Sequence, residues 1–270
     1  MSDSATRAPA VAGTFYPADP ARLRETVSGL LSQADRDLAE LVLPDQVRGL
    51  IAPHAGYMFS GGVAARAFAA ARRCEPAPQR AVLIGPAHYV GGVGAALPPA
   101  RFFSHPLGVH PVDQQASERL VASGVVEISE AAHQREHSLE VMLPFIQLLW
   151  GDLPIVPLVC GHIDYRKLTE AVDSVLGPGD ILIISSDLSH FHPAATAEQL
   201  DAALLEAWVE GDMSRLGQGE ACGKLPILTS MELGRRHGWQ RVLLGYAHSG
   251  MSHGSVESVV GYGAGVHHDP

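Results

Sequence analysis

The chain of 270 residues carries 19 lysines and arginines against 29 aspartates and glutamates, a net charge of −10 with the histidines neutral. A hydrophobic fraction of 46% with 18% charged residues excludes an intrinsically disordered chain. The acidic balance argues against nucleic acid or an anionic membrane as a partner, because both attract basic surfaces.

No internal repeat or Pro/Ser-rich linker divides the sequence, so we predict a single domain over residues 1–270. The first ten residues lack a hydrophobic core, and the apolar stretch 141–160 is broken by glycine and prolines, so we expect neither a secretory signal nor a membrane span. Cys74, Cys160 and Cys222 are odd in number and widely spaced, which predicts free thiols in a reducing compartment. We therefore expect a cytoplasmic protein.

Short apolar runs alternate with longer segments of helical periodicity along the chain. The predicted strands are 47–52, 80–84, 155–159, 181–185, 241–246 and 256–266. The predicted helices are 61–72, 113–122, 138–150, 165–176, 194–210 and 226–237. This alternation predicts an α/β fold with a central mixed, largely parallel sheet flanked by helices. Ligands of such sheets bind beyond the carboxyl ends of the strands.

Histidines follow three of the predicted strands. His54 comes after 47–52, His88 after 80–84, and His190 after 181–185, where Asp187 adds a carboxylate. Neutral imidazoles from different strands suit a divalent metal, so this pattern predicts a metal site at the carboxyl edge of the sheet. The alternative is that each histidine only caps its own loop by hydrogen bonding.

The segment GMSHG at 250–254 fits the G-x-S-x-G nucleophile elbow, with Ser252 as nucleophile. That motif needs a following helix and later acid and histidine partners, whereas residues 255–266 read as a strand and only the C-terminal tail remains. A serine hydrolase is therefore disfavoured.

The segment HQREH at 133–137 fits H-x-x-E-H, the inverted zinc-peptidase motif. The helical pattern starts near Ser138, so we expect His133 to lie in a preceding loop, away from the face that would carry His137. A zinc peptidase stays a minor alternative.

Several further segments carry a resemblance to a known family. They are RAPAVAGTFYP at 7–17, APHAGYMFSG at 52–61, IGPAHY at 84–89, EHSLEVMLPFIQ at 136–147, SSDLSHF at 185–191 and GYGAGV at 261–266. With these segments the sequence resembles the MEMO family, called AmmeMemoRadiSam system protein B in microbes, whose fold is like that of class III extradiol dioxygenases.

The resemblance implies a role for individual residues. His54 and His88 match the two metal-binding histidines of the family. His190 matches the acid/base histidine of the related dioxygenases, with Asp187 beside it to keep its tautomer. The substrate cleft is expected to be lined by His137, Glu140 and Tyr57.

The third metal ligand is where the chain departs from the family pattern. Animal members carry a cysteine and the dioxygenases a glutamate at the position that aligns with Ser252, and a hydroxyl is a poor ligand for such metals. We therefore predict His253 as the third ligand, with His248 and Glu257 as alternatives.

The function implied is that of a metal-binding protein with a dioxygenase-like site, holding Fe(II), or alternatively copper or zinc, and oxidising or binding a small catechol-like molecule. The alternative is a non-catalytic metal- or peptide-binding module that acts in signalling. The family name also implies two partners, an AMMECR1-like protein and a radical SAM enzyme.

Overall fold

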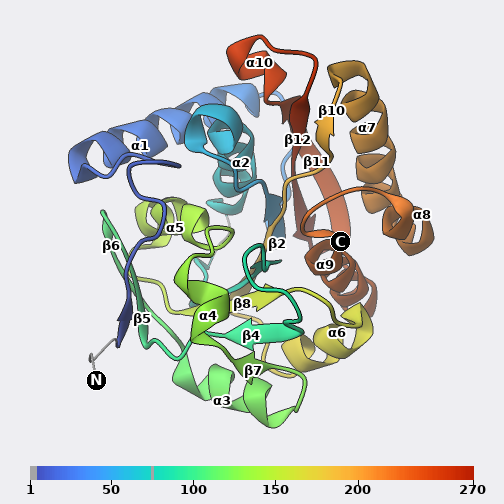
Figure 1. Ribbon diagram of the computed structural model, residues 1–270. Helices are drawn as coiled ribbons and strands as arrows, with labels where there is room; N and C mark the ends of the chain where they lie inside the picture. Colours follow the sequence, from blue (N-terminus) through green and yellow to red (C-terminus); the bar gives the residue numbers. More distant parts are fainter. Residues whose placement is uncertain (1–4, 74–75) are drawn as a thin grey trace.

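The computed structural model describes residues 5–73 and 76–270, apart from the side chain of His253. A nine-stranded sheet forms its centre (Figure 1). Four parallel strands lie in the middle, in the order β2 (Val47–Ala52), β9 (Asp180–Ser185), β3 (Arg80–Pro86) and β8 (Ile155–Cys160). One edge is formed by β12 (Val259–His268), antiparallel to β2, with β10 (His190–His192) and β11 (Gln240–His248) on it. The other edge is formed by β4 (Ala95–Leu97) and β7 (Glu127–Ile128). The predicted α/β fold with a mixed, largely parallel sheet is confirmed.

The central strands are apolar throughout because both of their faces are covered. Leu50, Leu83 and Ile183 enter the core on one face of the sheet. Their chain neighbours Ile51 and Ile184 enter the core on the other face. Since successive side chains of a strand point to opposite faces, a sheet covered twice needs continuous apolar runs, and these made the strands visible in the sequence.

Helices cover the two faces unequally. One face carries α1 (Pro20–Asp37), α2 (Tyr57–Ala71) and α5 (Leu143–Trp150). The other carries α3 (Gln114–Ala122), α6 (Tyr165–Asp173), α7 (Ala194–Glu210), α8 (Met213–Gln218) and α9 (Lys224–His237). None of the described helices is both long enough and apolar enough to cross a membrane.

Short elements complete the molecule beside the main sheet. A second, three-stranded sheet joins β1 (Thr6–Arg7), β5 (Phe102–His105) and β6 (Gly108–Pro111). One-turn or short helices are α4 (Glu130–Gln134), the 3-10 turn Glu140–Met142 and α10 (Gly250–His253). The helix predicted at 138–150 thus starts later, at Leu143, and His133 lies in α4 and not in a loop.

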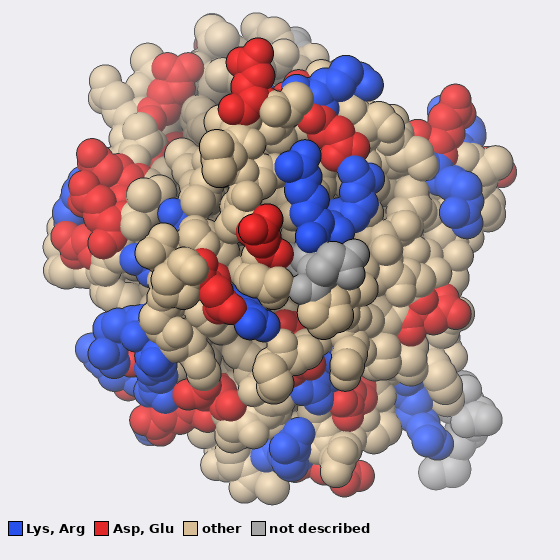
Figure 2. All heavy atoms as spheres, turned by 180° about the vertical axis from the view of Figure 1, so that it is seen from behind, with Lys and Arg blue, Asp and Glu red and all other residues tan. Residues whose placement is uncertain are grey.

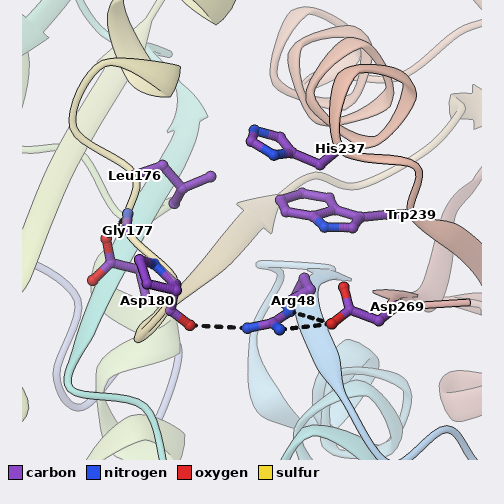
Figure 3. Close-up of a pocket in the computed structure, with 8 residues that line it drawn as sticks. Arg48, Leu176, Gly177, Asp180, His237, Trp239 and Asp269 are labelled. Atoms are coloured by element: carbon purple, nitrogen blue, oxygen red, sulfur yellow. Dashed lines mark hydrogen bonds and ion pairs between the residues drawn. The ribbon is translucent and has the colours of Figure 1, made fainter.

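Acidic and basic side chains are interspersed on the face shown in Figure 2. Ion pairs such as Arg66–Asp37 and Arg72–Asp35 join the two signs at the surface. A cavity of about 310 Å³ opens at the amino ends of the parallel strands, beside the first residues of β2 and β9 (Figure 3). Its Arg48 is bonded to Asp269 and to the Pro178 carbonyl. Because the cavity lies at the amino ends of these strands, it is at the opposite end of the sheet from the histidines that follow β2 and β3.

Candidate metal centre

His54 and His88 meet at the carboxyl edge of the sheet. Each follows a parallel strand by two residues, His54 after β2 and His88 after β3, and only β9 separates these strands. Their imidazole rings lie 5.2 Å apart, centroid to centroid, with an edge-to-face angle of 73°. The strand order therefore brings together two histidines that the sequence keeps 34 positions apart.

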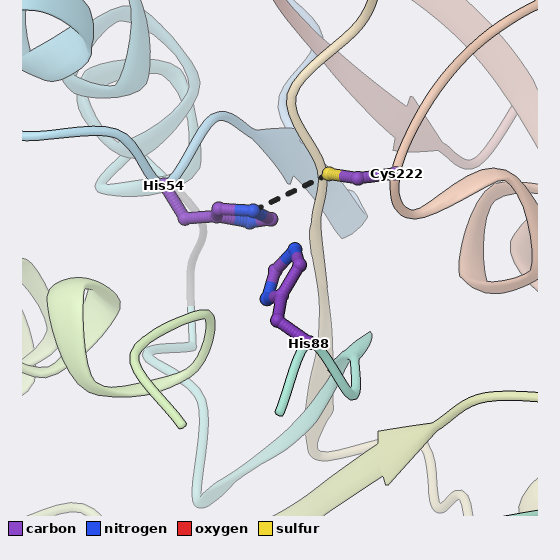
Figure 4. A group of neighbouring side chains, drawn as sticks. All are labelled: His54, His88 and Cys222. Carbon is purple, nitrogen blue, oxygen red and sulfur yellow. Dashed lines mark hydrogen bonds between the residues drawn. The ribbon is translucent and has the colours of Figure 1, made fainter. Parts of the chain in front are cut away.

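Cys222 joins these two histidines. Its Sγ lies 3.3 Å from His54 Nε2, and the ligand atoms of His54, His88 and Cys222 all lie within 4.8 Å of one another (Figure 4). The loop between α8 and α9 supplies this thiol and is held against the segment that follows β9, where the Asp187 N–H faces Sγ at 3.3 Å. Sequence reasoning identified Cys222 only as a free thiol, because nothing local indicates that its loop reaches this edge.

The hydrogen bonds around His54 place its lone pair on Nε2, the atom that faces Cys222 Sγ. Nδ1 lies 2.7 Å from Ser185 Oγ, and that hydroxyl donates its own proton to the Ser138 carbonyl at 2.5 Å. Ser185 must therefore accept from an Nδ1–H, which puts the lone pair of His54 on Nε2. Burial, reinforced by the neighbouring His137 and His88, lowers the pKa of His54 well below its usual range, so the ring is neutral at pH 7.

Glu136 orients the ring of His88 as Ser185 orients that of His54, by bonding Nδ1. Its Oε1 lies 2.9 Å from His88 Nδ1, and its Oε2 accepts the His88 backbone N–H at 2.6 Å. Burial alone would raise the pKa of Glu136, but the bonds from His88 and from the Ser138 N–H outweigh it and lower the pKa to about 2. An ionised carboxylate favours Nδ1–H on His88, so this ring also presents Nε2.

His137 packs against both rings. Its centroid lies 4.8 Å from that of His88, nearly parallel, and 5.4 Å from that of His54. His88, Glu136 and His137 form a second set of donor atoms within 4.8 Å. The Glu136 oxygens in that set already accept N–H groups, so we assign Glu136 to orienting His88 and not to holding a cation.

His190 lies beside the cluster, but Asp187 does not orient it. His190 is half-buried. A positive charge on His190 would lower the pKa of His54, and a positive charge on His88 would lower the pKa of His190. Asp187 is buried and its Oδ1 accepts the backbone N–H of His54 at 2.8 Å. The expected tautomer-setting bond from Asp187 to His190 is therefore wrong, because this carboxyl is used to fix the loop that carries His54.

Glu140 and Tyr57 are buried, and their polar atoms are hydrogen-bonded within the protein. Glu140 is fully buried and its oxygens are bonded to Arg7 Nη1 at 2.5 Å and to the Tyr16 hydroxyl at 2.6 Å. The Tyr57 hydroxyl donates to the Val141 carbonyl at 2.6 Å. The expectation that both residues contact a substrate is therefore wrong. Glu140 bonds the N-terminal segment to the 3-10 turn, and Tyr57 bonds α2 to the same turn.

Neither alternative to His253 as the third ligand lies in the cluster. The side chain of His253 is outside the described residues. His248 is buried and its Nε2 faces Glu198 of α7 at 3.3 Å, while Glu257 and Ser252 are exposed. Neither His248 nor Glu257 joins the two donor groups found among the described residues.

His133 does not share a helical face with His137. Its ring is buried, its Nε2 lies 3.0 Å from the Ala96 carbonyl and it packs against Phe103. The helix α4 ends at Gln134, before Glu136 and His137. The zinc-peptidase alternative is therefore wrong, because its motif requires one continuous helix.

Comparison with known proteins points to one family. A family model described as "Memo-like protein" matches residues 7–266. A MEMO1 family protein of Ignicoccus hospitalis is 37% identical, covering 96% of this chain and 97% of its own length. A second, from Aeropyrum pernix, is 36% identical with 96% and 98% covered. The crystal structure of an uncharacterized protein from Escherichia coli K12 matches with a TM-score of 0.55 at 15% identity, over 81% of this chain and 99% of that one, a likeness of fold alone.

Proposed function

The chain belongs to the Memo family, and from its donor set we propose that it binds a divalent metal ion through His54, His88 and Cys222. The observation that carries this proposal is the convergence of the three ligand atoms, with Nδ1 of each imidazole held by another side chain so that Nε2 is left as the ligand atom. Hydrogen bonds from the second ring nitrogen are the usual support of metal-bound histidines.

Two imidazoles and one thiolate suit zinc, iron or copper. Burial, with the nearby Asp187, raises the pKa of the Cys222 thiol to about 12, so the thiol is protonated at neutral pH when no cation is present. A cation at Sγ would displace that proton, which couples binding to pH. Three protein ligands would leave positions for a small exogenous ligand, and we propose that such a ligand is what the protein acts on or binds.

Cobalt(II) titration tests the metal proposal, because a thiolate bound to cobalt gives charge-transfer absorption that a histidine-only site lacks. We expect this band in the full-length protein, its loss in Cys222→Ser, and its retention in the matched variant Cys160→Ala, which removes a buried thiol at the end of β8. His54→Ala should weaken cobalt binding. An unchanged band in Cys222→Ser would overturn this ligand set.

Oxygen-dependent conversion of a catechol-like ligand is the second candidate, and the place of His190 favours it. When bound, iron(II) would supply the means to bring O₂ and substrate together. Burial lowers the pKa of His190, so its ring is neutral at pH 7 and able to accept a proton from a ligand beside His54 and His88. Oxygen uptake by the iron-loaded protein with catechol, lost in His190→Gln with metal affinity intact, supports this candidate. Metal binding without oxygen uptake in the wild type favours the non-catalytic alternative.

A further inference from the structure

Phe191 combines a disfavoured backbone with an exposed ring. Among the non-glycine residues that the structure describes, it alone has a positive φ, at +63°. The left-handed region is unfavourable for a residue with a Cβ, and such strain concentrates at functional positions. The Phe191 side chain is 76% exposed, so packing within the protein does not offset the strain.

The residues on either side of Phe191 are held firmly. The His190 N–H donates to Glu220 Oε1 at 3.1 Å, and His192 Nε2 faces Glu220 Oε2 at 2.9 Å. Both also pair with β12, where the register shifts between His190 and His192. One carboxylate and one bulged strand thus impose the left-handed turn that presents the Phe191 ring to solvent.

That ring lies next to His190, the histidine beside the candidate metal centre. Its centroid lies 5.7 Å from that of His190, and Glu220 precedes Cys222 by two residues. A second ring, Tyr89, is 46% exposed, follows His88 directly and has its hydroxyl 3.4 Å from His137 Nδ1. Exposed aromatic rings therefore neighbour histidines of the site, Phe191 next to His190 and Tyr89 next to His88 and His137.

We infer that Phe191 is a ligand-contacting residue, which packs against an apolar, ring-containing part of a small ligand whose polar end is held at His54, His88 and Cys222. This inference rests on the proposed function and adds a ligand class to it. A ligand ring on Phe191 would remove exposed apolar surface from water, and that burial is what the strained turn lacks in the free protein. Sites for small molecules commonly combine a few polar groups with such aromatic walls.

Two hydroxamates with the same metal-binding head group test the inference. Zinc-loaded, full-length protein is titrated with benzohydroxamate and with acetohydroxamate, which differ in the phenyl ring. We expect the wild type to prefer benzohydroxamate, and Phe191→Ala to lose about tenfold in benzohydroxamate affinity with acetohydroxamate affinity unchanged. Phe102→Ala, at another partly exposed phenylalanine on β5, is the matched control and should keep the preference.

Phe191→Gly separates the ring from the strain. Glycine adopts a positive φ freely, so this variant should unfold at a higher temperature than Phe191→Ala while losing the same preference for benzohydroxamate. Equal benzohydroxamate affinity in wild type and Phe191→Ala overturns the inference while the metal site stands. Failure of the wild type to bind zinc at all overturns the proposed function, and the inference with it.

Discussion

The carboxylate of Glu136 accepts two hydrogen bonds from His88, one from the backbone N–H at 2.6 Å and one at Nδ1 at 2.9 Å. The two residues are 48 positions apart, and neither lies in a helix or a strand. One side chain therefore fixes both the loop of His88 and the direction of its ring.

Replacing Glu136 with Gln should weaken zinc binding about 10- to 100-fold, because the amide nitrogen cannot accept the bond that the lost carboxylate oxygen accepted. Competition with a chelating dye measures the affinity. Glu130→Gln, at an exposed position of α4, is the control and should bind zinc as the wild type does. Equal affinity in Glu136→Gln would show that His88 needs no orienting partner.

Ser185 has the corresponding role at His54. Ser185→Ala should move the proton of the metal-free His54 ring away from Nδ1 and lower zinc affinity, because the acceptor at Nδ1 is lost. Ser185→Thr keeps the hydroxyl and should restore both. ¹⁵N chemical shifts of the imidazole report the tautomer, and an unshifted spectrum in Ser185→Ala contradicts the assignment.

Zinc binding at neutral pH should release one proton, and that proton comes from Cys222. Burial raises the pKa of this thiol to about 12, whereas burial keeps His54 neutral, so of these two ligands it is the thiol that has a proton to lose. The affinity should therefore rise about tenfold per pH unit between pH 7 and 9. Calorimetry in buffers of different ionisation enthalpy counts the proton, and Cys222→Ser should release none.

His133 makes stability depend on pH. Burial lowers the pKa of this histidine to about 4, below the unfolded value of 6.5, so its contribution is present above pH 6.5 and is lost as the pH falls towards 4. In His133→Gln, the slope of the unfolding free energy against pH should be smaller by the contribution of one proton, about 1.4 kcal/mol per pH unit in that window. Denaturant unfolding between pH 4 and 7 measures the slope, and zinc affinity should not change because His133 faces Ala96.

The buried pair Arg7–Glu140 should matter far more than an exposed one. Glu140→Gln leaves the Arg7 guanidinium, itself almost fully buried, without its countercharge, and should cost about 3–5 kcal/mol of unfolding free energy. Asp35→Asn breaks the exposed pair with Arg72 and should cost less than about 1 kcal/mol. Similar losses in the two variants would contradict the structural role given to Glu140.

The sheet could be predicted because its parallel strands are buried on both faces and so read as continuous apolar runs; β2 has the predicted bounds. The helix α1 was missed although its signals are present, with Asp19 capping the first turn, Pro20 inside it and Leu23 among its buried residues. Elements of two to four residues, such as β10, carry too few side chains for any periodicity to show.

Only the site residues that directly follow a parallel strand could be placed from the sequence. His54 and His88 follow parallel strands, so their meeting follows from topology. Cys222 reaches them from a loop whose position depends on long-range contacts, and no local pattern marks it. The roles predicted for Asp187 and Glu140 were wrong for the same reason. A buried carboxyl accepts hydrogen bonds from whichever donors the complete fold places around it.

His54 and Cys222 are separated by 168 residues, yet their ligand atoms are in contact. A cation shared by them would close a loop that contains most of the central sheet, and it could do so only in the folded chain. Linkage then adds about 2.7 kcal/mol to the free energy of unfolding when the free cation is at 100 times its dissociation constant. The melting temperature of the whole protein, and with it its resistance to proteases, would follow the supply of that cation.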